Sequence, residues 1–396
     1  MSEREVFVVG AARTAVGSFQ GGLSTVPAPR LGALCIAESV KRAGVPHDAI
    51  DEVMMGQVLT GAQGQAPARQ ASIFAGLPDS IPCMTIGKVC GSGLQTIILG
   101  TRTIKAGEGD VLVAGGQENM TLASYALEKA RSGYRLFNGE LVDMMVRDGL
   151  WDVYTNQHMG SCADKTAAEC EVGREEQDDY ATLSYTRAQK AIADGKFKGE
   201  IVPVEIPQRK GDPVIFDTDE GPGVFNEQKM RKLRPAFEKG ETASITAGNA
   251  SSINDGAGAV VLASAEAVKA HNLTPMARIV SSGLGARESH HFPLAPIIAI
   301  KNALASAGFK ASDIDRWEIN EAFAIVPILA MKEFDLTTDS VNLWGGAISI
   351  GHPIGASGTR IFITLMSVLK DTGGRYGLCT PCIGGGEGNA VIIEKL

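Results

Sequence analysis

The chain has 396 residues, of which 44% are hydrophobic and 21% are charged, and its formal net charge is −8 at pH 7. This length exceeds what one hydrophobic core usually supports, so we expect two or three globular domains. The negative charge disfavours nucleic acid and anionic membranes as partners. It still allows an anionic cofactor on a local basic run, either Arg209-Lys210 or residues 229–234.

Cysteine usage and the start of the sequence indicate the compartment. Seven cysteines, an odd number, favour a reducing environment over a disulfide framework. The acidic opening at 1–5 predicts neither a secretory nor a mitochondrial leader, and no apolar run is long enough to cross a bilayer. We therefore expect a cytoplasmic protein.

Short apolar strands alternate with helical stretches along the first part of the chain, which is typical of an α/β fold. The elements predicted in order are a strand at 6–9, a helix at 31–42, and strands at 51–55 and 111–114. The third of these strands is predicted to end in Gly115-Gly116.

The segment KVCGSGL at 88–94 sets Cys90 in front of an apolar pattern of helical period that ends at Gly107. Free N–H groups and the helix macrodipole favour an anion at a helix N-terminus, so we expect the pKa of Cys90 to be lowered toward the thiolate form. The small neighbours leave room for a substrate carbonyl to approach. These features suit a catalytic nucleophile, and a buried structural cysteine is the alternative.

Several landmarks recur at a nearly constant spacing. Residues 43–51 are echoed 264 residues later at 307–315, and the triplet at 91–93 is echoed 265 residues later. Gly115-Gly116 is echoed by three glycines at 384–386. The pattern predicts duplicated halves related by a pseudo-twofold axis, with coincidence among common α/β loops as the alternative.

Residues 120–250 differ in composition and pattern from the flanking halves, because they carry more charge and are predicted to form isolated helices and loops rich in Gly and Pro. We interpret them as an insertion that forms a lid or a ligand-holding domain. The expected division is therefore an N-terminal half at 1–119, an inserted domain at 120–250 and a C-terminal half at 251–396.

Two polar groups of the second half suit proton transfer and oxyanion binding. Asn320 follows a predicted strand at 317–319, where its amide could hold a water, donate to a developing oxyanion or cap a turn. His352 lies in a loop rich in Gly and Pro at 345–358, and histidine carries protons near neutral pH. The repeat places Cys90 and His352 at equivalent helix entries, facing each other across the axis.

The pair Cys379 and Cys382 has a Cys-x-x-Cys spacing, which suggests a redox or zinc site. No second Cys or His pair at ligand spacing accompanies it, so we expect no metal site there. The preferred interpretation is one working thiol, Cys382, above the glycine loop at 384–386, whose N–H groups can bind an oxyanion. Cys379 is then a core residue after a predicted strand at 376–378.

These residues resemble the motifs of a known family, the thiolases, over nearly the whole chain. The motifs are ARTAVG at 12–17, VCGSG at 89–93, GQENM at 116–120, AGNAS at 247–251, NEAF at 320–323, GHP at 351–353 and CIGGG at 382–386. The resemblance implies a thiolase-like α/β fold. In it, two duplicated βαβαβαββ halves form a five-layered α-β-α-β-α core, and an inserted loop domain serves CoA binding and tetramerisation.

The resemblance also implies a ping-pong Claisen condensation of two acetyl-CoA molecules to acetoacetyl-CoA and CoA, and its reversal, through an acetyl thioester on Cys90. His352 would activate Cys90 and, with a water held by Asn320, stabilise the thioester enolate in one oxyanion hole. Cys382 would be the general base for the second acetyl-CoA, and the N–H groups of Cys90 and Gly384 would line a second oxyanion hole. Neither a metal nor a cofactor is implied, because CoA thioesters are the substrates.

For the substrate tunnel, the resemblance implies contacts from Leu150, His158, Met159, Ala247, Ser251 and Phe323. The segment at 139–152 resembles the short-chain biosynthetic type, which implies a homotetramer built as a dimer of dimers. Two departures from the family concern acyl chain length, since Phe292 stands where Met is common and Trp344 where a small or polar residue is common. The loop at 220–224 is poor in basic residues, where relatives often offer an arginine to the adenine end.

Of four rival interpretations, the degradative thiolase and the thiol oxidoreductase stay open, whereas Asn320 with Cys382 argues against a ketoacyl synthase and the complete set of catalytic groups argues against a non-catalytic protein. A degradative 3-ketoacyl-CoA thiolase would accept longer chains, and a ketoacyl synthase of the same fold would carry a second His in place of Asn320 and lack Cys382. A thiol oxidoreductase would use Cys379 and Cys382. A non-catalytic acyl-CoA-binding or scaffold protein would lack a catalytic group, and the motifs lack none.

Overall fold

The computed structural model describes residues 4–396. The first residues of the acidic opening, on which the prediction of no leader partly rests, lie outside the described residues. Within the described part, no helix is both long and apolar enough to span a membrane.

The first half of the chain alternates strands and helices, as the sequence predicts. In order, its main elements are β1 (Val6–Arg13), β2 (Gly17–Ser18), α1 (Ala28–Ala43), β3 (Glu52–Gly56), α2 (Pro67–Phe74), β4 (Cys83–Ile86), α3 (Ser92–Ala106) and β5 (Val111–Asn119). The helix α1 carries a proline in its first turn and ends at Gly44 with a φ of 69°, a left-handed conformation that glycine adopts at little cost.

The last part of the chain repeats this order. It contains β12 (Asn254–Ser264), α7 (Ala265–Ala270), β13 (Ala277–Ala286), α8 (Ala295–Ala307), β14 (Arg316–Ile319), α9 (Ile325–Phe334), α10 (Ala347–Ile350), α11 (Ser357–Thr372), β15 (Tyr376–Thr380), β16 (Cys382–Ile383) and β17 (Glu387–Lys395). Like α1, α8 ends at a glycine, Gly308, with a φ of 69°, and a 3-10 turn follows each helix. The first echoed segment therefore has the same conformation in both halves.

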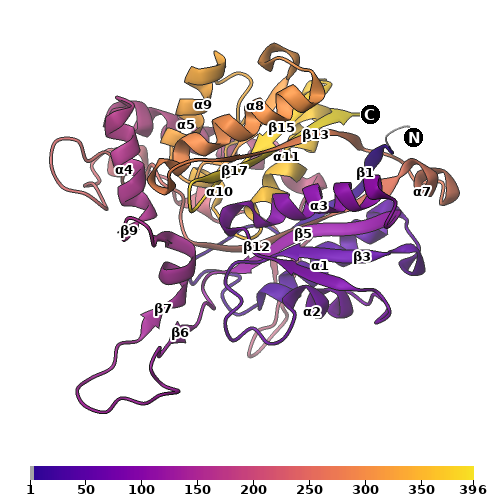
Figure 1. The fold of residues 1–396 in the computed structure, drawn as a ribbon, viewed down its shortest axis with the longest axis horizontal. Helices are drawn as coiled ribbons and strands as arrows, with labels where there is room; N and C mark the ends of the chain where they lie inside the picture. The colour runs from indigo at the N-terminus through magenta and orange to yellow at the C-terminus, as the bar shows by residue number, and fades with distance from the viewer. Residues whose placement is uncertain (1–3) are drawn as a thin grey trace.

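Between β5 and β12 the chain forms many short elements and two longer helices. They are β6 (Tyr125–Ala126), β7 (Val142–Asp143), η3 (Met145–Leu150), β8 (Trp151–Asp152), β9 (Gln157–His158), α4 (Met159–Glu169), α5 (Arg174–Ala193), β10 (Val204–Ile206), β11 (Val214–Phe216) and α6 (Glu227–Met230). In Figure 1, the chain between β6 and β7 extends away from the body as a long arm at the lower left.

The strands of the two halves form one continuous sheet of order β14-β15-β17-β13-β1-β12-β5-β3-β4, with β2 attached to β12 and β16 attached to β17, while β6 to β11 form separate two-stranded pairs. The two sides of this order correspond. β3 runs parallel to β5 as β14 does to β15, and β12 runs antiparallel to β1 and β5 as β17 does to β13 and β15. A short antiparallel pairing between β1 and β13 joins the halves, as a pseudo-twofold axis between these strands requires.

Figure 1 shows the layers of the core. The helices α8 and α9 cover one half of the sheet, α1 and α2 cover the other, and α3 and α11 lie between the two halves. The predicted five-layered α-β-α-β-α core is therefore confirmed. The central helices approach closely at their N-termini, because a Cβ on Gly358 would lie only 2.5 Å from the backbone nitrogen of Leu94.

The structure corrects two expectations about the halves. β5 does not end at Gly115-Gly116 but continues to Asn119, since both glycines pair with β12, and a Cβ on Gly116 would lie 2.2 Å from the carbonyl oxygen of Gly355. The echo at 384–386 is also wrong, because those glycines form the turn between β16 and β17. In addition, β12, which the expected division places in the C-terminal half, pairs with β1 and β5 in the sheet of the first half.

Candidate active site

Cys90 lies in a 3-10 turn, η2 (Val89–Gly91), directly before α3, so its predicted position at a helix start is confirmed. Val89 has a φ of 43°, a left-handed conformation that is strained for a β-branched residue. The Ser92 hydroxyl group holds this turn, because it accepts the N–H of Lys88 at 2.8 Å and donates to the carbonyl oxygen of Val89 at 2.7 Å. The strained turn presents Cys90 to a cavity.

The second half of the chain brings Cys382 and Gly384 to Cys90. Cys382 is the first residue of β16 and is fully buried, and Gly384 begins the turn that follows. The backbone N–H of Gly384 donates to the sulfur of Cys90. Gly91 permits this approach, because a Cβ there would lie 2.3 Å from a side-chain carbon of Ile383. One thiol from each half therefore lies at the same cavity.

His352 lies in the loop between α10 and α11. Gly351 precedes it with a φ of 117°, and a Cβ there would lie 2.5 Å from the side chain of Asn254. Oδ1 of Asn254 accepts the backbone N–H of His352 at 2.8 Å, and the N–H of Gly355 donates to the carboxylate of Glu118 at 3.0 Å. Side chains from β12 and β5 thus fix the loop that aims His352 into the cavity.

Hydrogen bonding selects one tautomer of His352. The Ser357 hydroxyl group donates to the carbonyl oxygen of Pro353 at 2.9 Å, and its oxygen lies 2.6 Å from Nδ1 of His352. Because that hydroxyl group has one hydrogen, Nδ1 must donate to it. Nε2 then carries the lone pair, and among the described residues it has no hydrogen-bond partner. The amide nitrogen of Asn320, at the end of β14, lies 3.4 Å from Nδ1.

Burial dominates the ionisation of these groups. Burial, together with the positive charge of Arg360, lowers the pKa of His352 to about 3. It raises the pKa of Cys90 to about 11, although the N–H of Gly384 acts in the opposite direction. It also raises the pKa of Cys382 well above its ordinary value, as does the neighbouring Cys90. The expectation of a Cys90 thiolate is therefore wrong for the free protein, because desolvation outweighs the helix terminus.

The cavity over these groups has a volume of about 330 Å³ and mostly apolar walls. Residues of η3, α4 and a 3-10 segment, η6 (Ser289–Leu294), contribute to it. Phe237 stacks on His158 with ring centroids 4.7 Å apart. Phe292 and Phe237 each meet Phe323 edge-on, at 5.8 and 6.3 Å respectively. This shape suits a slender, largely apolar chain that ends in a reactive group.

The structure brings together nearly all of the site residues predicted from the sequence. Those that line the cavity are Cys90, Leu150, His158, Met159, Ala247, Ser251, Phe323, His352, Cys382 and Gly384. Asn320 is buried against His352 and does not line the cavity. Of the two departures tied to chain length, Phe292 lines the cavity, whereas Trp344 packs edge-on against Phe197 in the core and has no place in its wall.

Sequence reasoning missed part of the cavity wall. The additional lining residues are Met120, Gly149, Ala236, Phe237, Ala250, Ser252, Ile253, Ala322 and Ile354. Met120, Ala250 and Ala322 stand inside the quoted motifs, so the motifs themselves were a signal for them. No local pattern marks Ala236 and Phe237, because only the fold of the inserted segment carries them to the cavity.

Comparison with known proteins shows which family shares this sequence and architecture. Residues 6–266 match the family profile described as "Thiolase, N-terminal domain", and residues 273–395 match "Thiolase, C-terminal domain". The chain is 49% identical over 396 residues to an acetyl-CoA acetyltransferase of Cupriavidus necator, with 99% of each chain covered. It is 44% identical over 393 residues to the mitochondrial acetyl-CoA acetyltransferase of Homo sapiens, covering 99% of this chain and 91% of that one.

Among solved structures, the chain is similar to the acetyl-CoA acetyltransferase of Bacillus anthracis, with a TM-score of 0.96, 38% identity, and coverage of 100% of this chain and 99% of that one. The duplicated five-layered core, with a cysteine from each half at one cavity, therefore defines a protein of the thiolase fold. The two profile matches and the full-length relatives go further, and the chain belongs to the thiolase family.

Proposed function

We propose that this protein is an acetyl-CoA C-acetyltransferase, which condenses two acetyl-CoA molecules to acetoacetyl-CoA and CoA and catalyses the reverse thiolysis. The observation that carries the proposal is the presence of Cys90, Cys382 and the unpartnered Nε2 of His352 at one apolar cavity. The similar proteins of C. necator, H. sapiens and B. anthracis are named for this activity, which supports the same assignment.

In the first half-reaction, Nε2 of His352 takes the thiol proton of Cys90 as the sulfur attacks the carbonyl carbon of acetyl-CoA. The C–S bond to CoA breaks, and the imidazolium returns the proton to the departing CoA sulfur. Burial and Arg360 disfavour the imidazolium, so the proton is passed on readily. The N–H groups of Cys90 and Gly384 stabilise the oxyanion, and each such donor is typically worth about 3 kcal/mol.

In the second half-reaction, Cys382 passes its thiol proton to Nε2 of His352 and, as a thiolate, removes a methyl proton from the second acetyl-CoA. Acetylation of Cys90 favours this thiolate, because the acetylated sulfur can no longer ionise, and a negative charge on Cys90 would raise the pKa of Cys382. His352, now carrying a hydrogen on Nε2, and a water held by Asn320 are the donors to the enolate oxygen. The enolate carbon attacks the acetyl carbon, and the C–S bond to Cys90 breaks. The proton on Nε2 of His352 passes to the released sulfur of Cys90, while Cys382 keeps the methyl proton as a thiol.

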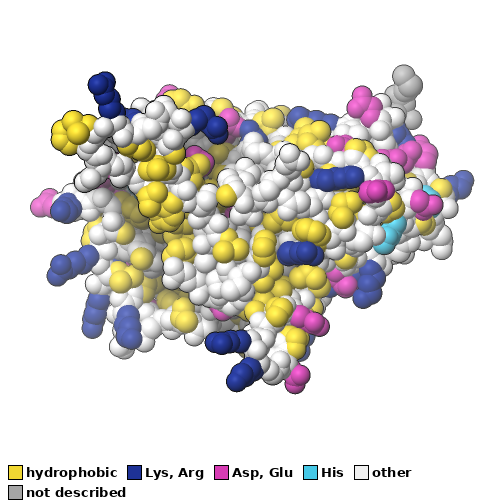
Figure 2. Space-filling view, turned by 90° about the horizontal axis from the view of Figure 1, so that it is seen from below, with side chains coloured by type: hydrophobic (Ala, Val, Ile, Leu, Met, Phe, Trp, Pro, Cys, Tyr) yellow, Lys and Arg dark blue, Asp and Glu magenta, His cyan; other side chains and the backbone are white. Residues whose placement is uncertain are grey.

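A CoA substrate also needs a site for its anionic end. The exposed basic run at 229–234 leads directly into Ala236 and Phe237 of the cavity wall. In Figure 2, Lys and Arg side chains gather at the left end of the molecule, where Figure 1 places α4 and the β6–β7 arm. We assign the binding of the CoA phosphates to Arg234 and its basic neighbours.

Two rival functions fit the site less well. A degradative 3-ketoacyl-CoA thiolase would use the same catalytic groups, but the three aromatic rings around the cavity favour a short acyl chain. A thiol oxidoreductase would need reactive thiols at Cys379 and Cys382. Both are free, but Cys379 is fully buried in the hydrophobic core and does not line the cavity, so no partner thiol reaches this pair.

The proposal extends to assembly and location. We propose a homotetramer built as a dimer of dimers, because the β6–β7 arm exposes Leu136, Phe137 and Leu141, with Phe137 88% exposed. Exposed apolar clusters of this kind commonly mark interfaces.

The proposed reaction requires no metal or cofactor, and a cytoplasmic location remains a prediction from cysteine usage.

The decisive experiment follows acetyl transfer directly. Incubation with acetyl-CoA should add one acetyl group to the wild-type protein at Cys90, as peptide mass spectrometry would show, and Cys90→Ala should gain none. Steady-state rates with acetoacetyl-CoA and with a long-chain 3-ketoacyl-CoA should favour the former. Acetylation at another residue, or faster cleavage of the long chain, would refute the proposal.

A further inference from the structure

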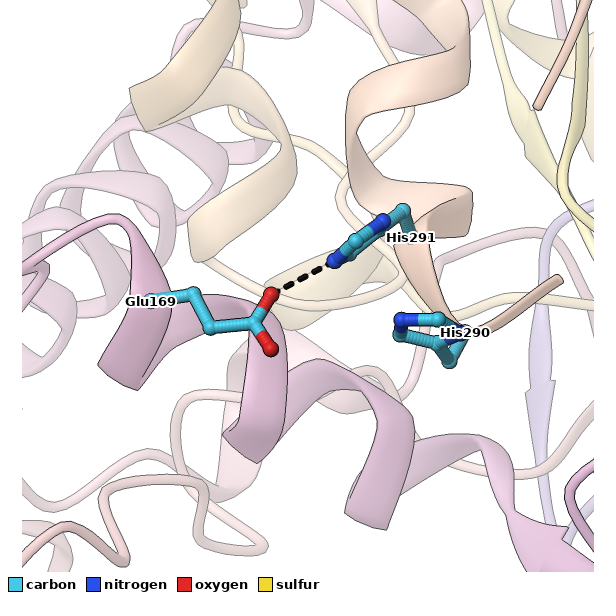
Figure 3. A group of neighbouring side chains, drawn as sticks. All are labelled: Glu169, His290 and His291. Atoms are coloured by element: carbon cyan, nitrogen blue, oxygen red, sulfur yellow. Dashed lines mark hydrogen bonds and ion pairs between the residues drawn. The ribbon is translucent and has the colours of Figure 1, made fainter. Parts of the chain in front are cut away.

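Two adjacent histidines on η6 and a carboxylate at the end of α4 form a cluster outside the cavity. Nε2 of His291 lies 2.5 Å from Oε2 of Glu169, and one ligand atom from each of Glu169, His290 and His291 lies within 4.8 Å of the other two. Figure 3 shows the two imidazole rings facing the Glu169 carboxylate from η6. The proposed acyl transfer uses none of these three side chains.

Packing of α4 against η6 fixes the backbone that carries this cluster. The hydroxyl group of Thr166, on α4, donates to the carbonyl oxygen of His290 at 3.0 Å and so ties α4 to η6. Phe292, the residue that follows the histidines, is buried in the cavity wall. The side chain of His291 is only 19% exposed, whereas Glu169 is exposed and free to rotate. The imidazole of His291 is therefore held in place, and the carboxylate of Glu169 can adjust to a ligand.

We propose that Glu169, His290 and His291 form a binding site for one divalent transition-metal ion of the zinc class. Two imidazole nitrogens and one carboxylate oxygen are donors that Zn²⁺ binds in proteins, and imidazole also suits Co²⁺ and Ni²⁺. Mg²⁺ and Ca²⁺ instead prefer sites made of oxygen. Three protein ligands leave one position of a tetrahedral ion for water, on the solvent side where Glu169 lies.

Entry of the ion requires a small local change. Bonds of about 2.1 Å in a tetrahedral site separate two ligand atoms by about 3.4 Å. Nε2 of His291 and Oε2 of Glu169 must therefore move apart by less than about 1 Å from their present 2.5 Å. Rotation of the exposed Glu169 side chain supplies this movement, and the ion then replaces the proton shared by the two atoms.

A second carboxylate supports the metal-binding tautomer of His291. Oε2 of Glu288 lies 3.7 Å from Nδ1 of His291, the ring nitrogen that does not face Glu169. Metal-bound histidines commonly donate their other N–H to a carboxylate, which orients the ring and strengthens the metal bond. Arg287 lies 3.4 Å from the same nitrogen and 3.5 Å from Glu288, so it can turn to Glu288 when Nδ1 takes the hydrogen.

A bound ion joins two walls of the cavity. α4 begins with Met159 and η6 contains Phe292, and both residues line the cavity. An ion held by Glu169 and His291 links these elements in the folded chain only, so it should also raise the thermal unfolding temperature.

The test is a titration of the full-length protein with Co²⁺ at neutral pH, followed by competition with Zn²⁺. We expect one tightly held Co²⁺ with visible bands of low-coordinate cobalt and without the sulfur-to-metal band that cysteine ligands produce. His291→Ala and the exposed substitution Glu169→Ala should each weaken binding at least about tenfold. The matched control His271→Ala, at an exposed histidine after α7, should leave binding unchanged.

The outcomes separate a metal site from a simple ion pair. Failure of both Co²⁺ and Zn²⁺ to bind would overturn the proposal and leave Glu169 and His291 as an ion pair. Binding that survives Glu169→Ala and His291→Ala, or that shows the sulfur-to-metal band, would place the ion elsewhere. Equal binding of Mg²⁺ would overturn the assignment to the zinc class.

Discussion

The side-chain oxygen of Ser357 lies 2.6 Å from Nδ1 of His352, in a part of the core closed to solvent. Since the serine hydrogen is directed to Pro353, the serine accepts the imidazole N–H and leaves Nε2 as the basic nitrogen. The first residue of α11 thus selects the nitrogen that can take the proton of Cys90. Its counterpart at the start of α3, Ser92, uses its hydroxyl group differently, to hold the strained turn around Cys90.

Ser357→Ala should lower kcat about tenfold to a hundredfold with little change in KM, because a lost hydrogen bond to a buried group costs about 1–3 kcal/mol. Ser357→Thr keeps a hydroxyl group and should recover most of the activity. Steady-state kinetics and the rate of Cys90 acetylation measure both effects. Wild-type rates in the alanine variant would show that Ser357 does not position His352.

The buried His352 should make stability depend on acidic pH. Its pKa is about 3 in the folded protein and about 6.5 in an unfolded chain, so between these values only the unfolded state binds the proton. The stability that the neutral, buried His352 contributes is therefore fully present above about pH 6.5. As the pH falls below that value, the free energy of unfolding decreases by up to about 1.4 kcal/mol per pH unit. Urea unfolding at several pH values should show a shallower decline for His352→Asn. Equal slopes would contradict the depressed pKa.

Cys382→Ser should separate the two half-reactions. The variant keeps Cys90, His352 and the N–H of Gly384, so it should still take one acetyl group from acetyl-CoA. Loss of the general base should lower condensation by about 10²–10⁴-fold. Mass spectrometry of Cys90 and a condensation assay measure the two steps on one sample. Condensation at the wild-type rate would exclude Cys382 as the base.

Phe292→Met should widen the acyl end of the cavity. Phe292 is buried in the cavity wall and meets Phe323 edge-on, whereas the unbranched methionine adapts its shape to its neighbours. The ratio of kcat/KM for a longer 3-ketoacyl-CoA to that for acetoacetyl-CoA should rise about tenfold, since one methylene in such a pocket is worth about 1–3 kcal/mol. An equal change for both substrates would instead place Phe292 along the CoA part of the cavity.

Local patterns in the sequence were enough for much of the fold and the site. The small residues after Cys90 and the apolar period beyond them mark the start of α3, and glycines at 44 and 308 mark matching helix ends. These features depend on the conformation of a few consecutive residues, so a sequence pattern records them directly. The motifs around His352 and Cys382 likewise predicted the loops that now face the cavity.

Other properties depend on residues that are distant in the sequence. The thiol of Cys90 is neutral because both halves cover it, and that desolvation outweighs the favourable helix start that the motif predicted. Gly116 looked like a strand end, yet its pairing with β12 keeps it inside β5. Phe237 reaches His158 only through the path of the inserted segment. Short motifs therefore determined which groups are present, whereas long-range packing decided their ionisation, their partners and the walls around them.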